Sequence, residues 1–140
     1  MATTATSAEG EVMAAIGAAL DVAAITTTLG CAVHDDVPQA PTYPYIRFES
    51  PTGVPWDTFG QAGKERMVWV HVFSTYAGGL EYRAIVAKVI QLLQDVALSV
   101  SGHALARLRY EEDVNGADED NGGVKVKHKI VMFRMNVLES

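Results

Sequence analysis

One stretch constrains the fold of this chain more than any other: a run of β-branched and aromatic residues that leads into an amphipathic helix pattern. The run, from Arg66 to Ser74, favours a strand, because such side chains fit a pleated, packed surface better than a helix. Gly78 and Gly79 then favour a sharp turn. From Leu80 the apolar period changes to about 3.6 residues, and one helical face collects Ile85, Val89, Leu92, Leu93 and Val96. A strand followed at once by such a helix predicts an α+β domain.

The sequence also predicts a second helix and further strands. Thr6 and Glu9 fit a capping box for an alanine-rich helix over residues 8–23. Short apolar or alternating runs indicate strands at residues 31–34, 45–49, 104–110 and 124–137. We therefore expect residues 1–140 to form a single α+β domain, in which an antiparallel or mixed sheet packs against two main α-helices. Residues 1–6 are small and polar, and we expect them to be flexible.

The connections between these elements differ in character. Three prolines within residues 38–44 fix backbone angles and remove amide donors, which predicts an extended, irregular link. Residues 51–63 have the composition of a long loop carrying Trp56 and Phe59, a first indication of an interaction surface. Residues 111–123 are almost purely acidic and turn-forming, so we expect a flexible, solvated loop there.

Charge and cysteine content narrow the functional classes. The 140 residues include 11 basic and 17 acidic side chains, and the net charge of −6 disfavours a main role in binding phosphate backbones. Cys31 is the single cysteine, which excludes an intrachain disulfide and a cysteine-ligated zinc site. No apolar run approaches the roughly 20 residues that span a bilayer, and residues 1–10 lack the basic start of a secretory signal. We expect a soluble chain without a membrane partner.

No pattern of catalytic or metal-binding residues stands out. Residues 118–122 carry part of the spacing of an EF-hand calcium loop, but Lys129 occupies the position of the final glutamate. Each of the four histidines lies in a different segment, without ligand spacing between them. The chain lacks a G-x-S-x-G elbow and a P-loop, so a turn is the better account of Gly78 and Gly79. We expect no catalytic residue, cofactor or metal.

Four segments, taken in order, resemble a known family. The first runs from Val33 to Pro38 and contains a D-x-V-P step; the second, from Tyr43 to Phe48, is a Y-P-Y-led strand. The third, Val68 to Ser74, is a strand with a Trp that ends in Ser, and the fourth is a Gly-led helix from Gly78 to Leu93. Together they resemble the tail-completion or tail-terminator proteins of long-tailed phages, a group once labelled only as a DUF3168 domain.

The resemblance implies a structural role without bond chemistry. Such a protomer assembles as a homohexameric ring on the head-proximal end of a tail tube, ends tube growth and presents a surface for head–tail joining. The implied partners are further copies of the chain, the tail tube protein and a head-completion or connector protein, and DNA passes through the lumen without specific binding. The implied localisation is the virion, after assembly in the host cytoplasm.

A ring needs head-to-tail contacts between neighbouring protomers, which suits irregular apolar segments. An acidic tip could line the lumen or face a basic partner, so that DNA passes over a repulsive wall. The candidate interface residues are Val37, Pro38, Trp56, Phe59, Asp113, Asp118, Glu119 and Asp120. Two alternatives stay open: another phage structural role, as a head–tail connector adaptor or a tube subunit, and a small ligand-binding domain or enzyme that uses the Gly78–Gly79 turn.

Overall fold

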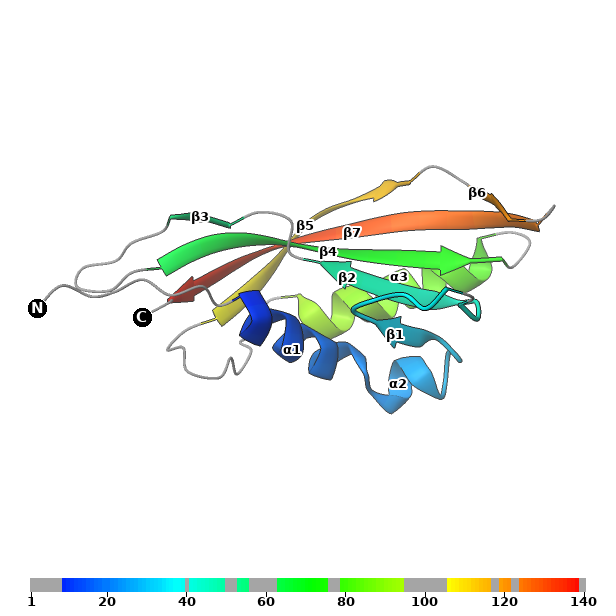
Figure 1. The fold of residues 1–140 in the computed structure, drawn as a ribbon, viewed down its shortest axis with the longest axis horizontal. Helices are drawn as coiled ribbons and strands as arrows, with labels where there is room; N and C mark the ends of the chain where they lie inside the picture. Colours follow the sequence, from blue (N-terminus) through cyan, green and yellow to red (C-terminus); the bar gives the residue numbers. More distant parts are fainter. Residues whose placement is uncertain are drawn as a thin grey trace, which may run out of the picture.

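A single mixed sheet with helices on one face forms the computed structural model, which describes residues 9–39, 41–49, 53–55, 63–75, 79–94, 106–116, 119–121 and 124–138 (Figure 1). The main strand order is β1-β2-β4-β7-β5, with β3 paired to β4 and β6 paired to β7. The strands are β1 (Ala32–His34), β2 (Tyr45–Glu49), β3 (Gly53–Pro55), β4 (Gly63–Ser74), β5 (Ala106–Asn115), β6 (Glu119–Asn121) and β7 (Val124–Leu138). The β1–β2 pair is parallel and the other pairs are antiparallel, which confirms the expected α+β fold.

The helices divide the sheet between them. The helix α1 (Glu9–Leu20) and the short α2 (Ala23–Thr26) lie at the β1 edge, where α1 contacts β1 and β2. The helix α3 (Leu80–Leu93) contacts β4, β7 and β5, as the strand-to-helix pattern predicts. None of the helices described is long and apolar enough to cross a membrane.

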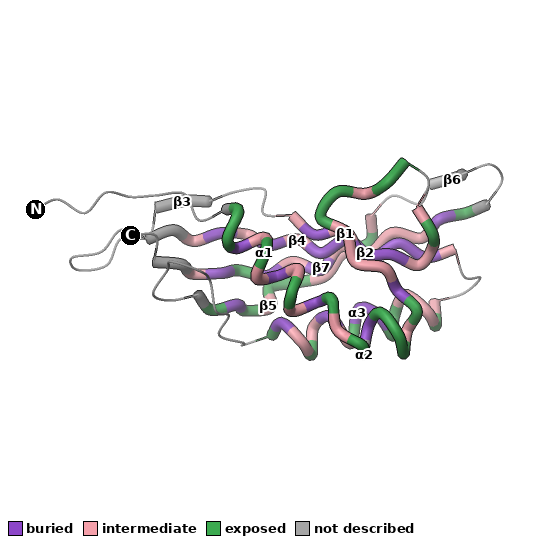
Figure 2. The backbone as a smooth tube through the Cα atoms, turned by 60° about the horizontal axis from the view of Figure 1, so that its bottom comes forward, coloured by how far each residue is buried: buried purple, intermediate pink, exposed green. Residues whose placement is uncertain are grey.

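Alternation along β4 and β7 places the core. The two strands pair continuously from Gly63↔Leu138 to Ser74↔Lys127. Every second side chain points to the helices and is buried, which Figure 2 shows as alternating colours along the strands. The fully buried residues of this face on the two strands are Val68, Val70, Val72, Val131, Phe133 and Met135. The prediction that β7 begins exposed at its lysines and enters the core near its end is confirmed.

Three expectations need correction. The strand expected at 104–110 continues to Asn115, so the first part of the acidic segment is sheet and not loop. Its charged side chains are compatible with a strand because β5 is the sheet edge, where they stay in solvent while the backbone pairs with β7. Within the expected 51–63 loop, Gly53–Pro55 forms β3 against Lys64–Arg66. The N-terminal helix is interrupted after Leu20, before α2 begins at Ala23.

Candidate functional site

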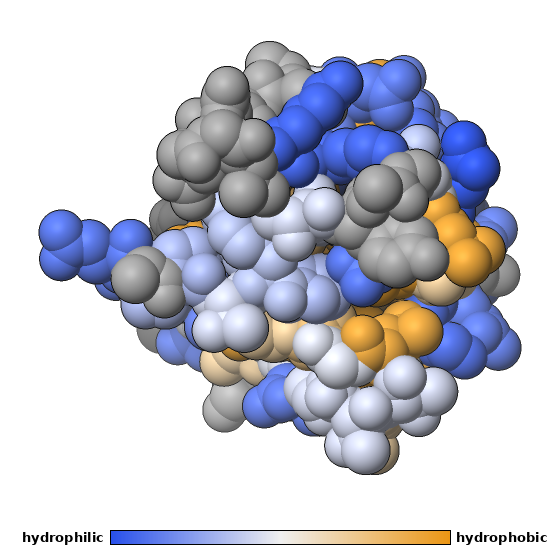
Figure 3. Space-filling model, turned by 90° about the vertical axis from the view of Figure 1, so that its right-hand side faces the viewer, coloured by the Kyte–Doolittle hydropathy of each residue, from blue (hydrophilic) through white to orange (hydrophobic). Residues whose placement is uncertain are grey.

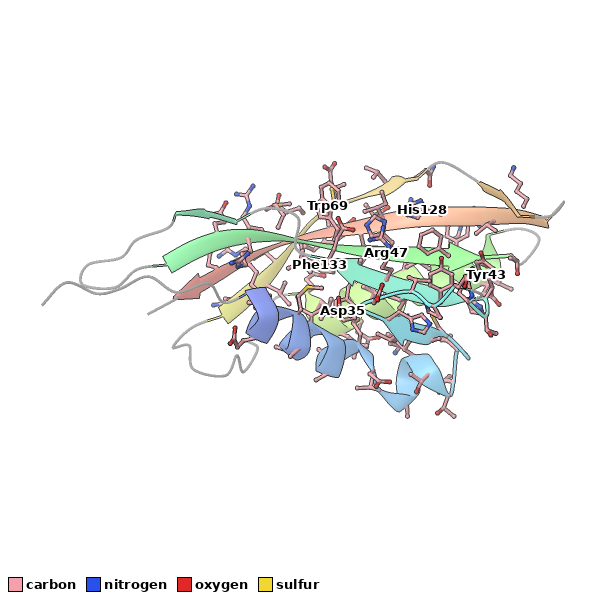
Figure 4. All side chains as sticks on the ribbon, in the orientation of Figure 1. Asp35, Tyr43, Arg47, Trp69, His128 and Phe133 are labelled. Carbon is pink, nitrogen blue, oxygen red and sulfur yellow. The ribbon has the colours of Figure 1, made fainter. Side chains whose placement is uncertain are left out.

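The face of the sheet away from the helices, called the open face below, gathers most of the aromatic and histidine side chains of the strands. Figure 4 shows Trp69 and His128 on this side and Phe133 on the other. The open face is partly covered at one end, where Tyr45, Phe73 and Val126 form a small buried cluster. The Tyr45 and Phe73 rings stack with centroids 4.7 Å apart. The folded chain therefore carries two apolar layers, one on each face of the sheet.

Val37 and Pro38, both predicted interface residues, have different environments. Val37 is half-buried and packs against the Tyr45–Phe73–Val126 cluster. Pro38 is exposed. Val37 thus holds the irregular connection against the sheet, and Pro38 is the one of the two that is available to a partner.

Two histidines meet at the centre of the open face. His71 Nδ1 lies 2.8 Å from His128 Nε2, and the rings stack with centroids 5.0 Å apart. On its other side, His71 Nε2 is 3.2 Å from Glu49 Oε2, without the direction of a hydrogen bond. Arg47 Nη1 binds the same carboxylate at 2.5 Å. Nothing in the local sequence signals this contact, because the two histidines are 57 positions apart.

Burial lowers the pKa of His71 to about 4, and the nearby Arg47 guanidinium lowers it further. At neutral pH the His71 ring is therefore uncharged, and one imidazole of the pair donates a proton while the other accepts it. Within the described ranges, no cluster of three or more His, Cys, Asp or Glu side chains is arranged to hold a metal ion.

Beside the histidines, the open face carries a partly exposed apolar strip. Met67 and Trp69 on β4 and Ile130 and Met132 on β7 are all half-buried, and Trp69 is opposite Met132 in the register. The Trp69 indole Nε1 is buried and has no hydrogen-bond partner. A half-buried Trp with an orphan donor is typical of an interface anchor, since its ring is apolar and its N–H still needs an acceptor. The sequence analysis read this Trp only as a strand residue.

Asp113, predicted to lie in a solvated acidic tip, is held in the sheet. The Tyr110 hydroxyl donates a hydrogen bond to Asp113 Oδ2, and Lys129 Nζ is 3.0 Å from Asp113 Oδ1. These two donors lower the pKa of the Asp113 carboxyl, with the tyrosine contributing most. The same hydrogen bond raises the pKa of Tyr110 to about 12.

The other predicted interface residues give less. Glu119 and Asp120 lie on β6, opposite Val126 and Lys125 in the register. Trp56, Phe59 and Asp118 lie outside the described residues.

The two nucleophilic side chains that the core contains are not set up for attack. Cys31 is buried, which raises the pKa of its thiol to about 12, and the Glu81 carboxylate raises it further. Ser74 is fully buried, and its hydroxyl donates to Glu81 Oε1 at 2.7 Å. A thiolate is the reactive form of cysteine, so Cys31 is a packing residue here.

Two depressions lie at the end of the molecule where α3 begins. A cleft of about 540 Å³ is lined by Gly79, Tyr82, Arg83, Asn115, Gly116, Lys127 and His128. A second, more apolar hollow lies beside the exposed Leu80 and Leu29. Seen from this end, Figure 3 shows small apolar patches between hydrophilic side chains. These depressions suit contact with another macromolecule as well as with a small molecule.

Comparison with known proteins agrees with this geometry. The model of the family described as tail completion protein gp17 matches residues 5–137. A chain in the virion of a native gene transfer agent particle is similar in structure, with a TM-score of 0.77, 22% identity and coverage of 92% of this chain and 96% of that one. A second solved chain, without a functional description, gives a TM-score of 0.62 at 15% identity, covering 94% and 96%. At these identities the two structures show a shared fold. Comparison with curated proteins gives no match.

Proposed function

Because the chain belongs to the family of tail completion proteins, we propose that it closes the head-proximal end of a phage-like tail tube as a ring. The family match over residues 5–137 carries the proposal, because it includes every described helix and almost all of the sheet. The family makes the protein a structural component of a phage tail. The ring, the end of tube growth and the head-joining surface are the proposed refinements.

Several features of the fold support an assembly role. The strip formed by Met67, Trp69, Ile130 and Met132 offers apolar area with one unsatisfied donor. The similar chain of the gene transfer agent belongs to a virion particle, which is a setting of the kind proposed. The proposed partners are further copies of this chain, the tail tube protein and a head-completion or connector protein.

For the lumen, the proposal shifts from the tip to the edge strand. Asp113 is paired with Lys129, so its charge is largely offset. Glu111 and Glu112 are exposed on β5, although Glu111 is 2.9 Å from Arg134 Nε. The net charge of −6 favours a wall that repels DNA and lets it pass without specific binding.

Deletion of the gene from its phage or prophage, followed by electron microscopy of the tails, tests the function. Overlong tubes without heads are the expected result, because an uncapped tube continues to add subunits. Tails of normal length that fail to attach to heads would contradict termination and assign the chain to a connector adaptor. Fully normal virions would overturn the tail-completion role. As a control, supplying the gene in trans should restore tails of normal length.

A further inference from the structure

The charges of this fold are separated between opposite edges of the sheet. Residues 1–46 contain no Lys or Arg. They form α1, α2, β1 and the connection after β1, all on one side of the molecule (Figure 1). We call this surface the β1 flank. Its exposed charged residues are Glu11, Asp21, Asp35 and Asp36. The β1 flank is therefore uniformly acidic over the part that the structure describes.

The opposite edge is basic and grooved. Arg107 and Arg109 are exposed on β5, the last strand of the main sheet order. Beside them, α3 presents one face at a spacing of four residues, made by Tyr82, Val86, Ile90 and Gln94. We call the seam between α3 and β5, together with the two arginines, the β5 flank.

Two hollows follow this seam. The first, of about 260 Å³, is lined by Tyr82, Arg83, Val86, Ala87, Ile90, Asp113 and Lys129. The second, of about 350 Å³, is lined by Gln94, Arg107, Arg109 and Tyr110. Asp113 is paired with Lys129, so its charge does not offset the arginines. Glu112 is opposite Met132 beyond the bulge, on the half of β5 away from Arg107. The β5 flank thus combines an apolar floor with positive charge.

We infer that the β1 flank of one copy docks on the β5 flank of the next, with Asp35 and Asp36 facing Arg107 and Arg109. The two surfaces are different, opposite in charge and on opposite edges of one sheet, which suits a head-to-tail contact that closes into a ring. A two-fold contact would instead place like charges together. The exposed β5 edge can also accept an extended segment, and the connection after β1 is extended at Pro38. This contact rests on the proposed ring and specifies its geometry.

Charge exchange between the flanks tests the contact. Arg107→Glu/Arg109→Glu makes both flanks acidic, and Asp35→Lys/Asp36→Lys makes both basic. Since all four side chains are exposed, the variants should fold, which circular dichroism and thermal unfolding verify. At low ionic strength, each double variant should self-associate about tenfold or more weakly than the wild type in sedimentation velocity.

Recovery of assembly separates a specific contact from a general charge effect. An equimolar mixture of the two double variants should form oligomers of wild-type size, because alternating copies restore opposite charges at each contact. The chain with all four substitutions keeps the net charge of −6 and should assemble alone. Double variants that assemble like the wild type, a mixture that stays dissociated, or a wild type that is monomeric at low ionic strength would each overturn the inference. Normal virions after gene deletion would overturn the tail role and leave this contact standing.

Discussion

His71 on β4 and His128 on β7 face each other across the open face, with a nitrogen of each ring 2.8 Å from the other. Such a contact needs one donor and one acceptor, so a second proton on the pair would remove it. The Phe73 ring stacks on His128 at 4.3 Å between centroids, and Glu49 approaches His71 from the other side. The two longest strands are therefore joined by a side-chain contact that depends on His71 being neutral.

The first prediction concerns the pH dependence of folding. The pKa of His71 is about 4 in the folded chain, against 6.5 for an unperturbed histidine. Between these values the unfolded chain binds more protons, so stability falls as the pH falls. The free energy of unfolding of the wild type should drop by up to about 3 kcal/mol more than that of His71→Gln across this interval. Urea denaturation at several pH values measures the difference.

A histidine outside the pair provides the control. His34 stacks against Tyr45, away from the His71–His128 contact. His34→Gln should therefore keep the pH profile of the wild type. If the profiles of the wild type and His71→Gln coincide, His71 does not titrate as a buried neutral side chain.

The second prediction concerns Cys31. Burial raises the pKa of its thiol to about 12, which reduces the thiolate fraction roughly a thousandfold relative to an exposed cysteine. A thiol reagent at mildly alkaline pH should leave the native chain unlabelled and label it rapidly in concentrated urea. Mass spectrometry over time follows the label. Native labelling at the rate of the denatured chain would contradict a packed Cys31.

The third prediction uses two glycines of the same helix. A Cβ at Gly17 would lie 3.1 Å from Phe48 Cζ, whereas a Cβ at Gly10 meets nothing within 4 Å. Gly17→Leu should destabilise the chain by about 1–3 kcal/mol, because the side chain separates α1 from β2. Gly10→Ala should stabilise it by up to about 1 kcal/mol through helix propensity. Thermal unfolding distinguishes them, and equal effects of the two changes would contradict the close packing of α1.

The fourth prediction concerns the acidic half of β5. Asp113→Asn weakens the hydrogen bond from Tyr110 and the ion pair with Lys129, and should cost about 1 kcal/mol. Because the pKa of Asp113 is lowered, this contribution is present at neutral pH and lost as the pH falls. Glu112→Gln, at an exposed neighbour, should change stability little. Equal effects of the two substitutions, measured by urea denaturation, would return Asp113 to the solvated tip of the sequence-based expectation.

The elements that the sequence predicted well are those whose period is unambiguous. The change of period at Leu80 located α3, and the continuous alternation from Lys125 to Met135 located β7. The strand β5 was cut short because acidic residues favour loops in isolation, whereas an edge strand tolerates them. The helix break before Ala23 had no cue in the alanine-rich pattern.

The candidate site was less predictable, because it depends on contacts between distant segments. His71 and His128 were each seen without a partner, and only the β4–β7 register brings them together. Pro38 is exposed as an interface residue requires, while Asp113 was placed in a loop that proves to be sheet. The role of Trp56 and Phe59, outside the described residues, stays a prediction.

The fifth prediction concerns Trp69 on the open face. Its buried Nε1 lacks an acceptor within the chain, a situation that usually costs about 1–3 kcal/mol. Trp69→Phe removes the donor and keeps an aromatic ring, so the isolated chain should be as stable as the wild type or up to about 1 kcal/mol more stable. If a tail partner supplies the acceptor, the same variant should complement a gene deletion less well than the wild type. Thermal unfolding and plaque counts give the two readings.

Opposite signs in these two readings distinguish an interface anchor from a packing residue. Val70→Ala, at a fully buried position next to Trp69 on the helix face, should lower both stability and complementation, because its loss leaves a cavity in the core. If Trp69→Phe behaves in the same way, the indole serves the fold alone. Full complementation by a stable Trp69→Phe chain would place the partner surface away from the centre of the open face.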